Sequence, residues 1–250
     1  ANIELRVVYL NMAIQKELER YKSGGSKILG THTAVNETSI VSSSLQDGGG
    51  TIPSPSTAKR MRIRLVTIGG GYDTRSLDLL MRNEIDEAWE LDLPTVVAGK
   101  KRLLAQWAKR ENDNNTTEGI LQRLFLRGVD LNDLDEVRKV LDDVFANNSN
   151  DDDGSVVMKT ILVSEAVVLY LDKPNVAPLM RLLAEHCDSL CFADRFPSDD
   201  GTEKSAANGD NDDEDALRTW LAANDWNLIE FLPKPGATRQ LGIARRSNAQ

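Results

Sequence analysis

The sequence predicts an α/β protein with a doubly wound, mostly parallel sheet that ends in an antiparallel hairpin. Two observations predict this fold. Between residues 63 and 224, short apolar runs alternate with segments of helical periodicity, and strands separated by helical patterns of about 10 to 15 residues are typical of parallel sheets covered by helices. Further along, the apolar runs 228–231 and 240–244 look like a closing hairpin. The length of 250 residues suits one domain over residues 1–250.

The first predicted element is an amphipathic helix over residues 3–21. Its apolar residues recur at spacings of three and four: Ile3, Val7, Leu10, Ile14 and Leu18. Charged residues lie between them, which is typical of a helix that packs one face on a domain. Strands are then expected at residues 63–68, 87–91, 124–129, 158–163 and 189–195. Helices are expected around 77–81 and at 96–107, 134–145, 176–186 and 217–224.

Two segments differ in composition from the rest of the chain. Residues 22–60 are rich in Gly, Ser, Thr and Pro, so we expect a flexible insert, which in a compact domain is usually a functional lid or disordered. Residues 196–216 are rich in Asp, Asn, Gly and Ser. We expect an acidic disordered loop there, because such a composition buries too little apolar surface to offset the entropy of ordering.

The charge of the chain argues against one class of partner. With 30 Lys and Arg against 39 Asp and Glu, the formal net charge is −9, whereas general nucleic-acid binding depends on clustered basic residues. Most of the excess acid lies in residues 199–215 and 151–153.

No apolar stretch of the sequence is long enough to span a bilayer. Two cysteines imply no disulfide framework and fit a reducing compartment, so we expect a cytoplasmic protein with neither nucleic-acid nor membrane partners.

The residues after the first predicted strand carry the strongest chemical signal. They read Gly-Gly-Gly-Tyr-Asp-Thr-Arg at 69–75, at the sheet edge where ligands of parallel sheets bind. Glycines let a ligand approach the backbone closely, and a helix N-terminus offers free N–H groups. Asp92 ends the second strand about 20 residues after this turn, the usual place for an acid that binds a ribose diol. Together these features imply a nucleoside-containing ligand.

Residues that are missing help to choose among nucleosides. A dinucleotide fingerprint needs a glycine where Thr74 stands, and Asp73 would face a pyrophosphate unfavourably. The spacing of Tyr170 and Lys173 does not match the Tyr-x-x-x-Lys of short-chain dehydrogenases, and no P-loop Gly-Lys-Ser/Thr occurs. A cationic nucleoside such as S-adenosylmethionine suits the acidic residues Asp73 and Asp92 better, because its sulfonium and ammonium groups are positively charged. A dehydrogenase stays open as an alternative that predicts binding of a nicotinamide cofactor.

Four motifs resemble those of a known family. They are Ile-Gly-Gly-Gly-Tyr-Asp-Thr-Arg at 68–75, Glu-Leu-Asp-Leu-Pro at 90–94 followed by Lys-Lys-Arg at 100–102, Gly-Val-Asp-Leu at 128–131, and Ser-Glu-Ala-Val-Val-Leu-Tyr-Leu at 164–171. In this order, the motifs resemble the leucine carboxyl methyltransferase family of class I S-adenosylmethionine-dependent methyltransferases. The resemblance implies a Rossmann-like methyltransferase fold and S-adenosyl-L-methionine as the cofactor.

The resemblance also implies roles for single residues. Gly69 and Gly71 would contact the methionine part of the cofactor. Asp92 would bind the ribose hydroxyls, and Asp130 with Leu131 would bind the adenine. The chemistry of the residues agrees, because a carboxylate can accept hydrogen bonds from a diol or from an exocyclic amine.

Two further residues complete the predicted site. Glu165, the acid after the fourth strand, would face the methionine ammonium or the methyl-transfer pocket. The family places an arginine on a helix before the glycine turn to pair with the methionine carboxylate, and Arg6 is the candidate here. Asn11 stands where relatives often carry Asp, the family's lysine before Arg6 has no counterpart, and the insert at 22–60 is a further departure.

The expected chemistry needs few catalytic groups. A carboxylate acceptor is already ionised at neutral pH, so its attack on a sulfonium methyl needs alignment and desolvation but no general base. We therefore expect no catalytic residue, and the spacing of His186, Cys187 and Cys191 matches no zinc site, so no metal is expected.

The identity of the methyl acceptor stays open. The resemblance implies a carboxylate, for example the C-terminal leucine of a type 2A protein phosphatase catalytic subunit. A small-molecule O-methyltransferase of the same family and a non-catalytic S-adenosylmethionine-binding protein are the alternatives. The first discriminating property is cofactor binding, because an enzyme of this family must bind S-adenosylhomocysteine.

Overall fold

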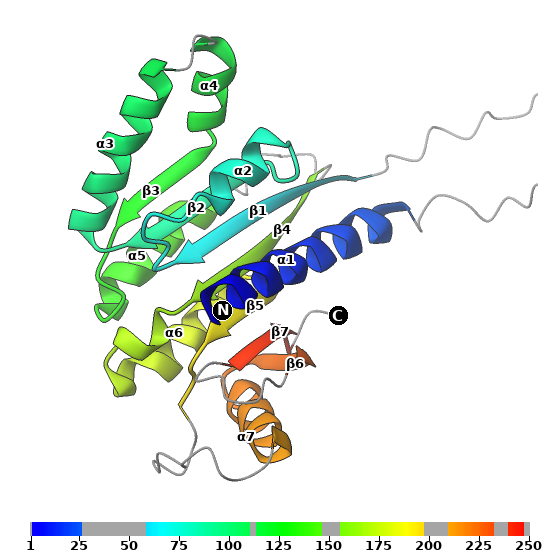
Figure 1. Cartoon of the computed structure of the whole chain (residues 1–250). Helices are drawn as coiled ribbons and strands as arrows, with labels where there is room; N and C mark the ends of the chain where they lie inside the picture. The colour runs from blue at the N-terminus through cyan, green and yellow to red at the C-terminus, as the bar shows by residue number, and fades with distance from the viewer. Residues whose placement is uncertain are drawn as a thin grey trace, which may run out of the picture.

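A computed structural model describes residues 2–26, 59–110, 114–146, 156–197, 210–232 and 240–247 (Figure 1). The strands are β1 (Arg60–Ile68), β2 (Glu87–Asp92), β3 (Leu124–Gly128), β4 (Val156–Glu165), β5 (Ser189–Asp194), β6 (Trp226–Phe231) and β7 (Gln240–Arg246). The α-helices are α1 (Asn2–Ser26), α2 (Arg75–Met81), α3 (Pro94–Arg110), α4 (Asn114–Leu121), α5 (Leu134–Ala146), α6 (Lys173–His186) and α7 (Asp210–Ala222). A short 3₁₀ helix, η2 (Val168–Tyr170), follows β4.

Within these residues, the strands form one 7-stranded sheet in the order β3-β2-β1-β4-β5-β7-β6. Neighbouring strands from β3 to β5 pair parallel. Strand β7 pairs antiparallel with both β5 and β6. The predicted α/β class, the mostly parallel sheet and the C-terminal antiparallel hairpin are all confirmed.

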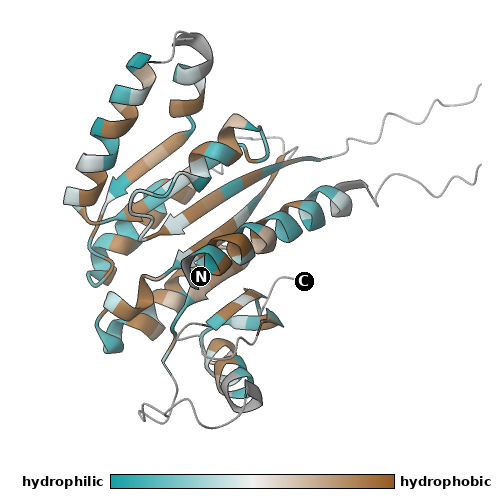
Figure 2. Ribbon diagram, in the orientation of Figure 1, coloured by the Kyte–Doolittle hydropathy of each residue, from teal (hydrophilic) through white to brown (hydrophobic). Residues whose placement is uncertain are grey.

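Helices cover both faces of the sheet (Figure 1). One core joins α1, α2, α3 and α4 to one face, and the other joins α5, α6 and α7 to the opposite face. Side chains alternate between the two cores along β1, where Leu65 belongs to the first and Val66 and Ile68 to the second. Figure 2 shows hydrophobic residues along the strands and on the helices that cover them. The central strands β1, β2, β4 and β5 are largely buried on both faces, which explains why they read as continuous apolar runs.

The parallel register brings distant segments of the chain to one edge of the sheet. Ile68, the last residue of β1, lies opposite Leu91 on one side and Ser164 on the other. Asp92, the last residue of β2, lies opposite Gly128. The residues that follow β1, β2 and β4 therefore meet at the carboxyl edge, where the predicted site residues are concentrated.

Some elements differ from the expected ones. Neither α4 nor η2 is predicted, and α1 continues to Ser26. Helix α7 begins at Asp210, inside the segment expected to be an acidic loop. Most of the predicted insert, residues 27–58, lies outside the described residues, as do residues 198–209 of the predicted loop.

Candidate functional site

The turn between β1 and α2 needs glycine at two positions. Gly69 and Gly71 have φ angles of +59° and +53°, in the left-handed region that other residues adopt rarely. At Gly69, an added Cβ atom would also lie 2.3 Å from Cγ2 of Val167. The glycine at 69 therefore lets the turn after β1 approach the segment after β4, so that two of the predicted cofactor-binding segments are in contact.

Asp92 binds this glycine turn through its carboxylate. Oδ2 accepts a hydrogen bond from the Gly71 N–H at 2.7 Å, and Oδ1 accepts one from the Leu93 N–H at 2.7 Å. A carboxylate offers about four lone-pair sites, so Asp92 can accept further hydrogen bonds from hydroxyl groups. The structure places Asp92 beside the glycine turn, and its role towards a ribose stays a prediction.

Glu165, the last residue of β4, lies between two arginines. Its Oε1 pairs with Nε of Arg6 at 2.5 Å, and its Oε2 pairs with Nη2 of Arg75 at 2.9 Å. The side chains of Glu165, Arg6 and Arg75 are 16%, 20% and 9% exposed. Charges removed from water interact more strongly than charges on the surface, so these pairs fix the Glu165 carboxylate in place. The three side chains together carry one net positive charge.

A pocket of about 260 Å³ opens over these residues. Its lining comes from α1, the end of β1, the glycine turn, the start of α2 and the end of β4: Arg6, Val7, Thr67, Ile68, Gly69, Gly70, Asp73, Arg75 and Glu165. The structure thus brings three predicted residues, Arg6, Gly69 and Glu165, into one pocket. Gly71 directly follows Gly70, which lines the pocket, and its N–H donates a hydrogen bond to Asp92.

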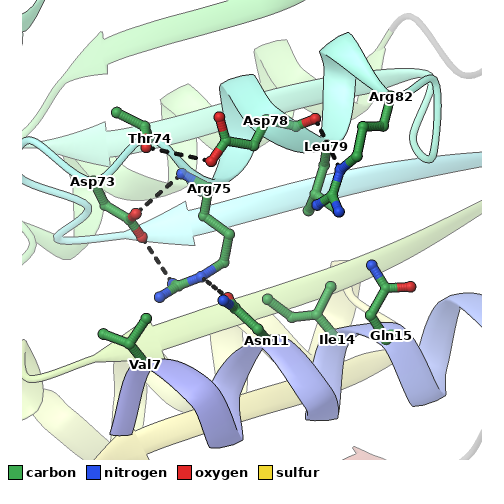
Figure 3. Close-up of a pocket in the computed structure, with 10 residues that line it drawn as sticks. All are labelled: Val7, Asn11, Ile14, Gln15, Asp73, Thr74, Arg75, Asp78, Leu79 and Arg82. Carbon is green, nitrogen blue, oxygen red and sulfur yellow. Dashed lines mark hydrogen bonds and ion pairs between the residues drawn. The ribbon is translucent and has the colours of Figure 1, made fainter. Parts of the chain in front are cut away.

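Arg75 is the site residue that the sequence analysis missed. It is the first residue of α2, and Figure 3 shows its side chain pointing from α2 towards α1. Nε donates to Oδ1 of Asn11 at 2.7 Å, and Nη1 pairs with Oδ2 of Asp73 at 2.8 Å. Arg75 ends the motif at 68–75, so the sequence shows its place after the glycine turn. Its partners Asn11 and Glu165 are far away in sequence, however, and nothing local indicates them.

A second pocket of about 250 Å³ lies between α1 and α2 (Figure 3). Val7, Asp73 and Arg75 line both pockets, so the two cavities adjoin at these side chains. Asn11 and Gln15 of α1 line the second pocket from one side. Helix α1 therefore contributes to both pockets and holds Arg75 from the side opposite α2.

The predicted adenine site lies at the next strand end. Asp130 follows β3 and lines a separate, open pocket of about 440 Å³ with residues at the start of α5 and with Asn175 of α6. Its Oδ1 accepts the Asn132 N–H at 2.9 Å. Leu131 is 5% exposed and belongs to the core on the α5 and α6 face. The structure therefore does not bring Asp130 and Leu131 into the pocket that Arg6, Gly69 and Glu165 line.

The turn that follows Glu165 is held by Asp194, which is fully buried at the end of β5. The Asp194 carboxylate accepts hydrogen bonds from the Ser164 hydroxyl at 2.7 Å and from the Val167 N–H at 2.9 Å. It also accepts the N–H groups of Val168 and Arg195. Between these donors, Ala166 has a φ of +57°, which disfavours any residue with a Cβ atom. The bonds to Asp194 hold this strained turn and thereby orient Glu165.

A family model described as leucine carboxyl methyltransferase matches residues 56–184 of this sequence. The chain belongs to the leucine carboxyl methyltransferase family. The matched residues include the glycine turn, Asp92, Asp130 and Glu165, but not Arg6.

Several solved structures are also similar to the chain. A riboflavin-derivative dimethyltransferase from Streptomyces davawensis is 17% identical, with 74% of this chain and 50% of that chain covered and a TM-score of 0.42. Mitomycin 7-O-methyltransferase is 15% identical, with 74% and 49% covered and a TM-score of 0.44. An O-methyltransferase family protein from Burkholderia thailandensis is 14% identical, with 75% and 52% covered and a TM-score of 0.42. The chain thus spans about half the length of these structures. No curated protein sequence matches it.

Leucine carboxyl methyltransferase family membership implies S-adenosylmethionine as the cofactor, and the residues at the pocket fit this molecule. Its methionine end carries an ammonium, a carboxylate and a sulfonium, and the pocket offers both the Glu165 carboxylate and the arginines Arg6 and Arg75. Its ribose has two hydroxyls, for which Asp92 has free acceptor capacity. Gly69 and Gly71 keep the backbone of the turn free of side chains.

Other reactive groups of this family member lie away from the pocket. Cys187 and Cys191 are buried in the two cores, and burial raises the pKa of both thiols, so they stay protonated. His186 stacks on Phe145 with ring centroids 4.7 Å apart, and burial lowers its pKa.

In the described segments, no group of three or more His, Cys, Asp or Glu side chains could hold a metal ion. None of the helices in these segments is both long and apolar enough to cross a membrane.

Proposed function

We propose that the chain is an S-adenosylmethionine-dependent O-methyltransferase that acts on a carboxylate. The observation that carries the proposal is the arrangement around Glu165, whose carboxylate pairs with two arginines in a pocket beside a glycine turn, with Asp73 as a second acid in the lining. This set of charges matches an amino-acid group with an ammonium, a carboxylate and a neighbouring sulfonium. Family membership supports the same cofactor.

The proposal assigns a binding role to each residue of the site. Gly69 and Gly71 let the methionine part approach the backbone, and Asp92 binds the ribose. Glu165 attracts the positive end of the cofactor, while Arg6 and Arg75 provide the positive charge for its carboxylate. Bound there, S-adenosylmethionine supplies an electrophilic methyl group on a sulfonium.

Asp130 and Leu131 are proposed for the adenine. Asp130 lines the open pocket at the end of β3, and its second carboxylate oxygen can accept from an exocyclic amine. Leu131, the next residue, has its side chain buried in the core and would act through its backbone. This part of the site thus continues the binding surface along the carboxyl edge of the sheet, from the end of β2 to the end of β3.

The protein contribution to the reaction is binding and orientation. A carboxylate acceptor is ionised near neutral pH and carries its own nucleophilic electron pair, so no side chain has to remove a proton. The rate then depends on in-line alignment and on the removal of water. Accordingly, the proposal assigns no side chain as a general base and requires no metal.

The proposed acceptor is the C-terminal leucine of a protein, such as a type 2A protein phosphatase catalytic subunit. The support is the family description, leucine carboxyl methyltransferase. The residues that would select an acceptor, including 27–58 and 198–209, lie outside the described part of the chain. The acceptor therefore has to be identified by experiment.

A direct test uses labelled S-adenosylmethionine and two peptides that end in leucine, one with a free carboxylate and one amidated. The proposal expects label only on the free carboxylate, released by mild base because the product is a methyl ester. A Glu165→Ala variant should lose the activity, whereas Glu185→Ala, on the surface, should keep it. Label transfer to a small carboxylate but to neither peptide would favour a small-molecule enzyme. Binding of S-adenosylhomocysteine without any transfer would favour a non-catalytic protein.

A further inference from the structure

A buried ion pair lies beneath the glycine turn. Lys100 of α3 and Glu90 of β2 pair at 2.5 Å between Nζ and Oε2, with side chains only 8% and 5% exposed. Two charges this deep in a protein are stable only if their geometry is good and further hydrogen bonds satisfy them. Both groups have such bonds, which join the pair to the turn between β1 and α2 and to the first turn of α2.

Each partner contacts a different part of the turn. The Glu90 carboxylate lies against Gly70, where an added Cβ atom would be 3.7 Å from Oε2. It also accepts a hydrogen bond from the side chain of Ser76, in the first turn of α2. The Lys100 ammonium donates to the backbone oxygen of Asp73. The ion pair thus supports the turn at its start, at its end and at the helix that follows.

This support continues into the pocket through a series of bonds. The Asp73 N–H donates to the Gly70 carbonyl oxygen at 3.0 Å, which closes the turn. The Asp73 carboxylate holds the guanidinium of Arg75 at 2.8 Å, and Arg75 holds Glu165 at 2.9 Å. A displacement of Asp73 would therefore move Arg75 and Glu165, which line the pocket together with Asp73 and Arg6.

We infer that Lys100 is a positioning residue of the cofactor site, which together with Glu90 fixes the glycine turn so that Asp73 and Arg75 are set for binding. The identity of the ligand rests on the proposed function. Lys100 lines neither pocket beside Arg75, so it acts through the turn and makes no contact with the ligand.

The environment of Glu90 explains why both charges are needed. Burial raises the pKa of Glu90, the neighbouring Lys100 and Ser76 oppose this rise, and Asp73 adds to it. Without Lys100, an ionised Glu90 would lie unpaired beneath the turn and repel Asp73. A Lys100→Met variant therefore loses a hydrogen bond to the turn and also leaves a buried charge without a partner.

The experiment separates these two losses with a second variant. Glu90→Gln/Lys100→Met removes both charges, so it should recover thermal stability relative to Lys100→Met, but it still lacks the donor to the Asp73 backbone. The matched control is Arg64→Met, which removes a buried cation of β1 that pairs with Glu87, away from the turn. Each variant is examined by hydrogen exchange of the amides at 69–76 in the free chain and by calorimetric titration with S-adenosylhomocysteine.

We expect Lys100→Met and the double variant to show faster exchange at 69–76. Their affinity for S-adenosylhomocysteine should fall on the order of tenfold to hundredfold, the range seen when residues that orient the ligating groups of metal sites are removed. Arg64→Met should lose stability while keeping both properties.

Three results would overturn the inference. They are unchanged exchange at 69–76 in Lys100→Met, recovery of affinity together with stability in the double variant, or an equal loss of affinity in Arg64→Met. If the unaltered chain itself does not bind S-adenosylhomocysteine, the proposed function fails, and the exchange measurements still decide the role of Lys100.

Discussion

The guanidinium of Arg75 pairs with the carboxylate of Glu165 at 2.9 Å, across 90 residues of sequence. Arg6 pairs with the same carboxylate across 159 residues. One acid therefore joins the glycine turn, the end of β4 and helix α1. Its removal should change cofactor binding more than the removal of any single surface charge.

Glu165→Gln should weaken binding of S-adenosylhomocysteine by roughly tenfold or more, because a hydrogen bond to a charged group contributes about 1.5–3 kcal/mol and two arginines lose their partner. Calorimetric titration measures the change. Glu185→Gln is the control, since Glu185 pairs with Arg138 at 3.4 Å and both side chains are 54% exposed. Exposed pairs of this kind contribute little, and equal effects of the two variants would contradict the assigned site.

Asp92→Asn should weaken S-adenosylhomocysteine binding by roughly tenfold or more. An amide in this position presents an NH₂ group either to the Gly71 N–H or to the Leu93 N–H, so the turn and the ribose lose an acceptor. Asp86→Asn is the matched control, because Asp86 accepts the Ile63 N–H at 2.7 Å at the opposite end of β2. The prediction fails if Asp86→Asn reduces affinity as much as Asp92→Asn.

Gly69→Ala should destabilise the fold more than Gly71→Ala. Both substitutions place a Cβ atom at a positive φ, which costs roughly 1–2 kcal/mol. At 69 the new atom would also clash with Val167 at 2.3 Å, whereas at 71 nothing lies within 4 Å. Urea unfolding monitored by circular dichroism compares the two, and an equal loss of unfolding free energy would refute the contact between these segments.

Asp194→Ala should lower the free energy of unfolding by on the order of 3–5 kcal/mol, because several buried donors lose their acceptor and each costs about 1–3 kcal/mol. Ser164→Ala removes one of these donors together with its need for an acceptor, so it should cost only about 1 kcal/mol. Chemical denaturation measures both values. Similar small losses for the two variants would show that Asp194 does not hold the turn after β4.

Glu17 of α1 predicts a pH dependence of stability. Burial alone would raise its pKa, but hydrogen bonds from Arg245 and Arg20 outweigh burial and lower the pKa below 4.5. A carboxyl group with a lowered pKa in the folded state stabilises the fold above its unfolded pKa, and this contribution is lost as pH falls through the folded pKa.

Glu17→Gln should therefore be less stable than the unaltered chain at about pH 7, with the difference shrinking at about pH 3. Denaturant unfolding at both pH values measures it. Glu230→Gln provides the comparison, because Glu230 pairs with Lys16 on the surface, with side chains 35% and 49% exposed. A pH-independent difference for Glu17→Gln would contradict the role of this buried carboxylate.

Local sequence patterns predict most of the sheet. The strands are apolar runs because both faces of the sheet are covered, and the antiparallel hairpin follows from its two closely spaced runs. Helix α4 is missed because its sequence, Asn-Asn-Thr-Thr-Glu-Gly-Ile-Leu, combines residues of low helix propensity. Packing of Ile120 and Leu121 in the core beneath α3 stabilises it instead, and this contact is not visible in a local pattern.

Among the site residues too, some could be predicted from local sequence and others could not. Gly69, Gly71, Asp92 and Glu165 could be predicted because each follows a strand, and parallel strands bring their carboxyl ends together. Arg75 and the pair of Glu90 with Lys100 could not, since their function depends on which distant side chains they meet. Nothing in the sequence distinguishes Lys100 from Lys101, yet burial by α3 packing separates the two.

The pairing of β1 with β4 has a consequence for how the protein is made. Nine consecutive residue pairs, from Arg60 with Val156 to Ile68 with Ser164, join strands that are far apart in the chain. Contacts between such distant segments form slowly, because a long loop must close first. During synthesis, the glycine turn therefore leaves the ribosome well before Glu165 exists. A nascent chain acquires the ability to bind its ligand only after β4 has been inserted beside β1.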